Sequence, residues 1–215
     1  MEATANRRGS STVKPVQETE KLRVLVLNEF LRLGRAPTRT ELTQRLRMAM
    51  SELDRYLRLL ERDDILVLGE NGEITAAYPY SASQTIHKVE VEGKALFANC
   101  AVDALAIPFM IRRDAVIESQ CSSCGTPLRI VFEDSRISVS QPSGIQVWYL
   151  PPQPCGASVK YQCPAINFFC NERHVEKWRS EHLELAGKSL TLKEAAEHGR
   201  RTYGNSLQIK HNRLG

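Results

Sequence analysis

The chain has no long hydrophobic run and no large excess of charge. Its longest nearly apolar run, residues 101–111, has 11 residues and includes Asp103, whereas a membrane-spanning helix takes about 20 apolar residues. The first 14 residues are polar and basic and lack the apolar core of a secretory signal. We therefore expect a soluble, cytoplasmic protein without a membrane partner. The net charge of +4 is too small to require nucleic acid.

The composition is otherwise that of an ordinary globular protein, with 42% hydrophobic and 25% charged residues over 215 positions. No internal repeat is visible. Disulfides are rare in a reducing cytoplasm, so cysteines there more often bind metal or catalyse reactions. Six positions carry cysteine: Cys100, Cys121, Cys124, Cys155, Cys163 and Cys170.

The N-terminal third predicts a winged-helix-like module over residues 18–80, after a disordered tail at residues 1–17. Apolar periodicity and capping patterns predict helices at residues 18–33, 38–47 and from Ser51, closed by Gly34 after the first. A hairpin at 65–77, with a turn at 69–72, follows them. Arginines on the third helix invite a DNA-binding interpretation, but acids lie beside them, so nucleic acid is an unlikely partner.

Residues 81–215 predict a second domain of strands with flanking helices, after a linker at residues 78–81. Strands are expected at residues 86–91, 128–132, 137–140, 145–150, 159–161 and 165–169, a loop at 151–156, and helices within 171–185 and 191–203. The last ten residues are expected to fray. The fold class is therefore α+β, with a mixed or antiparallel sheet.

Residues 99–108 place a thiol and a carboxylate in an apolar run. In a helix from an Asn99 N-cap to Pro108, Cys100 and Asp103 would share one face. The helix dipole would favour the Cys100 thiolate, and apolar neighbours would raise the pKa of Asp103 towards neutrality. The alternative is purely structural: a buried cysteine that packs as a small hydrophobe and an acid that caps the helix.

Cys121-Ser122-Ser123-Cys124-Gly125 has the spacing of half a structural zinc site. The sequence shows no second C-x2-C, so Cys121 and Cys124 are either zinc ligands or a core residue and a turn thiol. The histidines show no ligand spacing and are expected at the surface or as capping groups: His87, His174, His182, His198 and His211.

Three features together resemble the organomercurial lyases, also called alkylmercury lyases. They are the C-x2-D of Cys100 and Asp103 in an apolar run, Cys121 after a strand-like stretch, and Cys163 just before Phe168-Phe169. The resemblance implies that Cys100, Cys163 and Asp103 are catalytic and hold mercury, that Cys121 is structural, and that the N-terminal helices are a degenerate winged helix. Cys124, Cys155 and Cys170 have no counterpart in that pattern, and Asn99 occupies a slot where an aromatic can stand.

The implied chemistry is protonolysis of R–Hg⁺ to R–H and Hg²⁺, which serves mercury detoxification. Thiolates are preferred ligands of soft cations, and an aspartate with a raised pKa can move a proton to the departing carbon. No cofactor is then required; Hg²⁺ is the bound product, which cytosolic thiols or a mercuric reductase would accept. Residues expected near the substrate are Phe97, Asn99, Phe168 and Phe169, with ordinary core packing as the alternative for the phenylalanines.

Two other functions stay open from the sequence. One is a metal-responsive winged-helix transcriptional regulator, in which the cysteines sense a soft ion and Arg55, Arg58 and Arg62 meet DNA. The other is a thiol carrier that binds metal without cleaving a bond.

Overall fold

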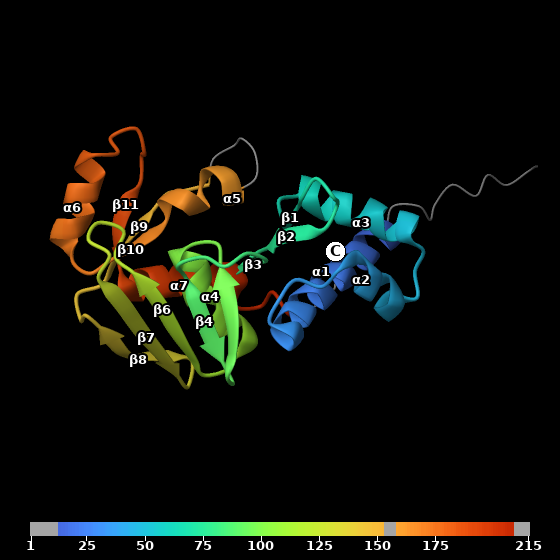
Figure 1. Ribbon diagram of the computed structural model, residues 1–215, viewed down its shortest axis with the longest axis horizontal. Helices are drawn as coiled ribbons and strands as arrows, with labels where there is room; N and C mark the ends of the chain where they lie inside the picture. Colours follow the sequence, from blue (N-terminus) through green and yellow to red (C-terminus); the bar gives the residue numbers. More distant parts are fainter. Residues whose placement is uncertain (1–12, 153–157, 209–215) are drawn as a thin grey trace, which may run out of the picture.

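The N-terminal part consists of three helices and a β-hairpin. The computed structural model describes residues 13–152 and 158–208 (Figure 1); residues 1–12 of the predicted tail, most of the predicted 151–156 loop and the last seven residues lie outside this description. Residues 13–17 were expected in the disordered tail but belong to the first helix. The elements are α1 (Val13–Leu33), α2 (Arg39–Leu46), α3 (Met50–Arg62), β1 (Leu66–Leu68) and β2 (Ile74–Ala77).

Local sequence signals account for most of these helix ends. Thr38 and Glu41 form a capping box at the start of α2, and Gly34 ends α1 with φ +70° and a bond from its N–H to Phe30 O. The capping pattern expected at Ser51 is wrong, because α3 begins one residue earlier, after Ala49, without a side-chain cap. The amphipathic stripe of α3 buries Leu53, Leu57 and Leu60 and holds the helix without that cap.

An antiparallel sheet of eight strands runs through the molecule in the order β1-β2-β3-β5-β4-β6-β7-β8. Its further strands are β3 (Tyr80–Ser81), β4 (Lys88–Val91), β5 (Lys94–Ala98), β6 (Ala115–Gln120), β7 (Pro127–Glu133) and β8 (Arg136–Gln141). The linker expected at residues 78–81 is wrong, because β3 pairs with β2 on one side and β5 on the other. The N-terminal hairpin is thereby continuous with the large sheet (Figure 1).

A second, three-stranded sheet of order β10-β9-β11 is formed, together with several helices, by the C-terminal part of the sequence. The remaining elements are α4 (Ala101–Ile111), β9 (Gln146–Tyr149), α5 (Ser158–Tyr161), a 3-10 turn η1 (Cys163–Ala165), β10 (Asn167–Phe169), α6 (Glu172–Ser180), β11 (Lys188–Thr191) and α7 (Leu192–Tyr203). The strand expected at residues 159–161 is wrong: the Ser158 N–H and hydroxyl both bond to Asp64 carboxylate oxygens, which cap a short helix.

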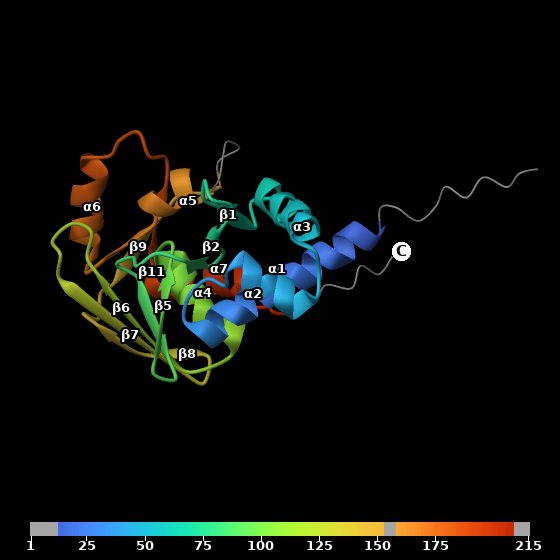
Figure 2. The same ribbon diagram turned by 45° about the vertical axis from the view of Figure 1, so that its right-hand side comes forward.

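The core centres on α4, which is buried on all sides. Every residue of α4 except Phe109 is buried, and α7 packs against it (Figure 2). The contact is close because Gly199 has no side chain: a Cβ there would lie 3.0 Å from Val102 O. The helix was expected to end at Pro108 but continues to Ile111, where Phe109 packs edge-to-face on Phe132 at 5.3 Å. Tertiary packing thus compensates for the loss of the helical hydrogen bond that proline, without an N–H, cannot donate.

Candidate active site

The structure brings Cys100, Asp103 and Cys163 together. A sulfur or carboxylate oxygen from each lies within 4.8 Å of those of the other two, although Cys163 is about sixty residues further along the chain. Cys163 Sγ lies 3.9 Å from Asp103 Oδ2. All three are buried, with exposed fractions of 2% for Cys100, 3% for Asp103 and 6% for Cys163. Two thiols and one acid therefore share a dry site.

Backbone contacts at the start of α4 explain this convergence. Cys100 is the N-cap residue of α4, and its sulfur accepts a bond from Asp103 N–H at 3.4 Å. The Ala101 N–H donates to Ile166 O at 3.1 Å, and the Ile166 N–H donates to Cys163 O at 3.0 Å. The turn that carries Cys163 is thereby held directly against the end of the helix that carries Cys100.

Asn99 is not the N-cap that the sequence suggested. Its side-chain amide donates instead to Pro79 O at 3.3 Å and to Tyr80 O at 3.1 Å. These bonds hold β3 against the end of β5, so Asn99 anchors the strand that leads into the site. Its proposed contact with substrate stays a prediction.

Burial governs the protonation of the cluster. Burial raises the pKa of Asp103 from 3.8 to about 7, and hydrogen bonding from Cys100, Asn99 and Tyr203 opposes this. Burial also raises the pKa of the Cys100 thiol, with the charge of Asp103 and the neighbouring Cys163 acting in the same direction. The expected thiolate stabilisation by the helix dipole is thus outweighed at Cys100. The acid, as the sequence suggested, can hold a proton near neutral pH.

Tyr203, in the last turn of α7, is a site residue that the sequence did not reveal. Hydrogen bonding from its hydroxyl lowers the pKa of Asp103 and so opposes the effect of burial there. Burial raises the pKa of Tyr203 itself, and the charges of Asp103, Cys100 and Cys163 add to this effect. Tyr203 is therefore a neutral donor at physiological pH. Only the packing of α7 on α4 brings it there, and no local motif marks it.

The phenylalanines expected near the substrate occupy different environments. Phe168 and Phe169 are fully buried; Phe168 packs on His87 with ring centroids 5.6 Å apart, and Phe169 packs on Trp178 at the same distance. Phe97 is only half-buried and alternates along β5 with the buried Leu96 and Ala98, so it points to the other face. Their role as a substrate wall stays a prediction.

The segment before Cys163 is tied to the N-terminal part. The Tyr78 hydroxyl donates to Asp64 Oδ1 at 3.1 Å and accepts from Val159 N–H at 2.8 Å. Asp64 itself accepts from Ser158. These bonds fix α5, which leads directly into η1 and Cys163, so the N-terminal module contributes to placing the second thiol.

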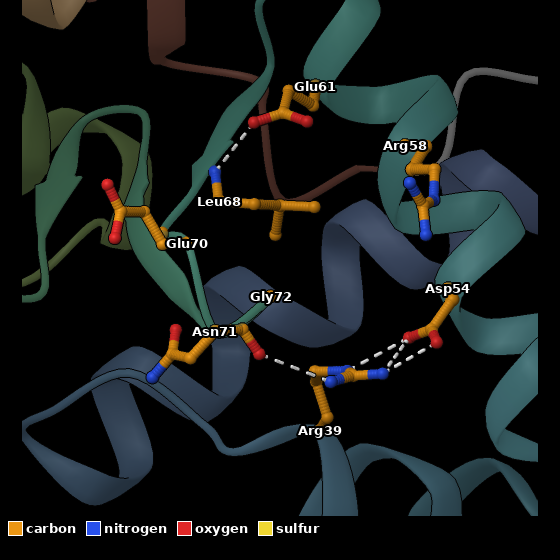
Figure 3. A pocket seen from close by; sticks show the side chains of 9 residues that line it. Arg39, Asp54, Arg58, Glu61, Leu68, Glu70, Asn71 and Gly72 are labelled. Carbon is orange, nitrogen blue, oxygen red and sulfur yellow. Dashed lines mark hydrogen bonds and ion pairs between the residues drawn. The ribbon is translucent and has the colours of Figure 1, made fainter.

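Two cavities among the described residues lie away from this cluster. One of about 320 Å³ lies between α3 and the β1–β2 turn (Figure 3). There Arg39 is paired with both carboxylate oxygens of Asp54, and Glu61 accepts from Leu68 N–H. A larger one of about 880 Å³ lies between β8 and α7. Neither of these two cavities is lined by Cys100, Asp103 or Cys163.

Two expectations about histidines are wrong. His87 is buried at 3% exposure, with Nδ1 2.9 Å from Ser119 Oγ, and burial lowers its pKa to about 4. His174 faces sulfur: its Nδ1 lies 2.9 Å from Cys170 Sγ and 3.6 Å from Cys121 Sγ. The sequence did carry a signal for the second case, because Cys170 and His174 are four residues apart at the start of a helix.

The described cysteines are all free thiols, and they fall into two groups, Cys100–Cys163 and Cys121–Cys124–Cys170. Cys155 lies outside the described residues. None of the helices in residues 13–152 and 158–208 has both the length and the apolar composition that crossing a bilayer requires.

Comparison with known proteins identifies the family. The family model for alkylmercury lyase matches residues 80–204. An alkylmercury lyase of Bacillus cereus is 35% identical over 116 residues, 54% of this chain and 52% of the relative. One of Staphylococcus epidermidis is 31% identical over 133 residues, 62% of this chain and 60% of the relative. The chain thus spans between half and two thirds of the length of these curated relatives.

A solved structure gives the same fold. The mercury-bound form of MerB2 superimposes with a TM-score of 0.74 at 22% identity, covering 91% of this chain and 100% of that one. The matched residues 80–204 contain Cys100, Asp103 and Cys163. The chain belongs to the alkylmercury lyase family.

Proposed function

We propose that this chain is an organomercurial lyase that cleaves the carbon–mercury bond of R–Hg⁺ to give R–H and Hg²⁺, with Cys100, Cys163 and Asp103 as its catalytic and mercury-binding residues. The observation that carries the proposal is the convergence of two thiols on one buried carboxyl group. Membership of the family supports the substrate class, and the chemistry of the three groups supports the reaction.

The two thiols bind the substrate through its mercury atom. Mercury is a soft cation, which binds thiolates in preference to oxygen or imidazole ligands. Cys163, the most exposed of the three at 6%, forms the first sulfur–mercury bond. Its proton passes to the Asp103 carboxylate, whose Oδ2 lies 3.9 Å from the sulfur. Cys100 then forms the second sulfur–mercury bond.

Cleavage follows when Asp103 returns a proton to carbon. Two sulfur ligands raise the electron density on mercury and weaken its bond to carbon. The electron pair of that bond stays with carbon, which takes the proton from Asp103 and leaves as R–H. Mercury remains Hg(II), held by both sulfurs. Of the two thiol protons, one ends on carbon and the other is released, so the step needs no oxidant or reductant.

Other parts of the chain serve this reaction indirectly. The three helices and hairpin before β3 have the order of a winged helix, and we propose that residues 18–80 form such a module. The bonds from Asp64 and Tyr78 to Ser158 and Val159 support a structural use of that module, with residues 81–215 as the catalytic domain. A cytoplasmic location would supply thiols, or a mercuric reductase, to accept Hg²⁺.

The test is turnover of methylmercury. The purified chain, incubated with methylmercury and excess small thiol, should release methane and one Hg²⁺ for each methane. The matched control carries both Cys100→Ser and Cys163→Ser, which removes the sulfurs with little change in volume. It should release no more methane than thiol alone. A folded unaltered chain that gives no methane above this background would contradict the proposal.

A further inference from the structure

A second cluster of metal-binding side chains lies away from Cys100. Cys121 follows β6 and Cys124 lies in the turn between β6 and β7, whereas Cys170 follows β10 and His174 lies in the first turn of α6. In both views α6 stands at the end of the β6–β7 strand pair (Figures 1 and 2). The three sulfurs and a nitrogen of His174 all lie within 4.8 Å of one another.

The separations approach those of a tetrahedral site. Zinc bonds of about 2.3 Å to sulfur and 2.0 Å to nitrogen place two sulfurs ~3.8 Å apart and sulfur and nitrogen ~3.5 Å apart. Cys124 Sγ lies 3.8 Å from Cys170 Sγ, and Cys121 Sγ lies 3.6 Å from His174 Nδ1. The separation of Cys170 Sγ from His174 Nδ1 is shorter, 2.9 Å. A small outward movement of one side chain would admit an ion.

The backbone around the cluster is shaped for ligands. The Gly125 N–H donates to Cys121 O at 2.8 Å, and Gly125 has φ +71°, a conformation that glycine adopts without strain. This tight turn aims both of its cysteines at α6. The Thr126 hydroxyl lies 3.0 Å from Cys124 Sγ, and the Asn171 amide donates to Cys170 Sγ at 3.4 Å. Such outer contacts orient sulfur ligands and stabilise their negative charge.

We propose that Cys121, Cys124, Cys170 and His174 form a structural zinc site, which is separate from the mercury-binding pair. Three thiolates and one imidazole are a common zinc set, and four protein ligands leave no open position for a substrate. Cys121 and Cys170 are buried, with exposed fractions of 1% and 8%, so the ion would be largely enclosed by protein. His174 would bind through Nδ1 and keep its proton on Nε2.

The zinc site would join two segments whose relative position affects the proposed catalytic site. The Ser122 N–H already donates to Phe168 O at 3.0 Å, which places the β6–β7 turn against β10. A zinc ion would cross-link that turn to the start of α6. Because β10 begins four residues after Cys163, the cross-link would fix the position of the segment that carries the second catalytic thiol.

The test is metal content, measured without any mercury compound. The full chain, purified under reducing conditions from zinc-supplemented medium, should contain about one zinc per chain. Cobalt(II) in its place should give the visible absorption of a tetrahedral site with thiolate ligands. Cys124→Ser alters an exposed ligand, and His174→Ala alters a partly exposed one. Each should weaken zinc binding by more than the ~10–100-fold that loss of an outer contact causes.

Two controls separate this site from its surroundings. Ser123→Ala changes the same turn without removing a ligand and should keep one zinc, as should the chain with Cys100→Ser and Cys163→Ser. The proposal is overturned if reduced chain reconstituted with zinc holds none. It is also overturned if Cys124→Ser and His174→Ala keep their zinc while the chain with Cys100→Ser and Cys163→Ser loses it. Isolation of Cys124 and Cys170 as a disulfide under the same reducing conditions would overturn it as well.

Discussion

The Asp103→Asn chain is expected to bind methylmercury as the unaltered chain does but to release methane about 10²–10⁴ times more slowly, the range that general acid–base catalysis contributes. An amide has nearly the size and shape of the carboxyl group, so both thiols should keep their positions. It cannot take a proton from Cys163 or deliver one to carbon. Binding and cleavage should therefore separate in this variant.

A single-turnover experiment distinguishes the two steps. Mercury bound per chain is measured after removal of free methylmercury, and methane is followed over time in the same sample. Asp134→Asn is the matched control, because Asp134 is an exposed acid in the turn between β7 and β8. It should behave as the unaltered chain. Equal methane release from Asp103→Asn and the unaltered chain would show that another group supplies the proton.

The same substitution is expected to stabilise the protein, and more so at higher pH. The pKa of Asp103 is raised from 3.8 to about 7 in the folded chain. Between these values the unfolded chain has released the proton while the folded chain retains it, so the free energy of unfolding falls as pH rises. The loss begins near pH 4 and is complete above pH 7. Over three pKa units it amounts to about 4 kcal/mol.

Urea unfolding at pH 5 and pH 8 measures this cost. Asparagine carries no titrating proton, so the stability gained by Asp103→Asn over the unaltered chain should grow by about 3 kcal/mol between the two values, two pKa units at about 1.4 kcal/mol each. The Asp134→Asn chain, measured in the same way, is the reference for the effect of replacing an exposed carboxyl group by an amide. If the gain from Asp103→Asn is the same at both pH values, Asp103 does not titrate between them, and its role as a proton carrier near neutral pH is contradicted.

Local sequence signals predicted much of the secondary structure. The capping boxes at Thr38 and Thr191 mark the starts of α2 and α7, and the turn at residues 69–72 closes with a bond from Gly72 N–H to Gly69 O. These features depend on neighbours within a few residues. The predicted class was α+β with a mixed or antiparallel sheet, and the strand pairs of the large sheet are antiparallel.

Elements whose conformation depends on residues far away in the sequence were not predicted. Residues 159–161 look like a short strand, but Asp64, far along the chain, caps a helix there. Tyr80 looks like part of a linker but pairs with Ala98 in the large sheet. Cys100 takes the capping position expected for Asn99, because the Asn99 amide donates instead to the carbonyls of Pro79 and Tyr80. In each case a long-range bond outweighed a local preference.

The contacts of the candidate site likewise divide into those that are local in the sequence and those that depend on tertiary packing. Cys100 and Asp103 are predicted neighbours because a helix start joins them. Their approach to Cys163 depends on the contact of Ala101 with Ile166, for which the family resemblance was the only guide. Tyr203 and the pairing of Cys121 with His174 depend on helix packing and on the meeting of two sheet ends. No spacing along the chain encodes these contacts.

The central claim, that two distant sulfurs jointly hold the metal, is tested most directly by a crystal structure of the chain after turnover of methylmercury. The anomalous signal of mercury locates the ion without ambiguity. We predict one Hg²⁺ between Cys100 Sγ and Cys163 Sγ, within bonding distance of both and beside Asp103. Mercury bound to only one of these sulfurs, or found only among Cys121, Cys124 and Cys170, would contradict it.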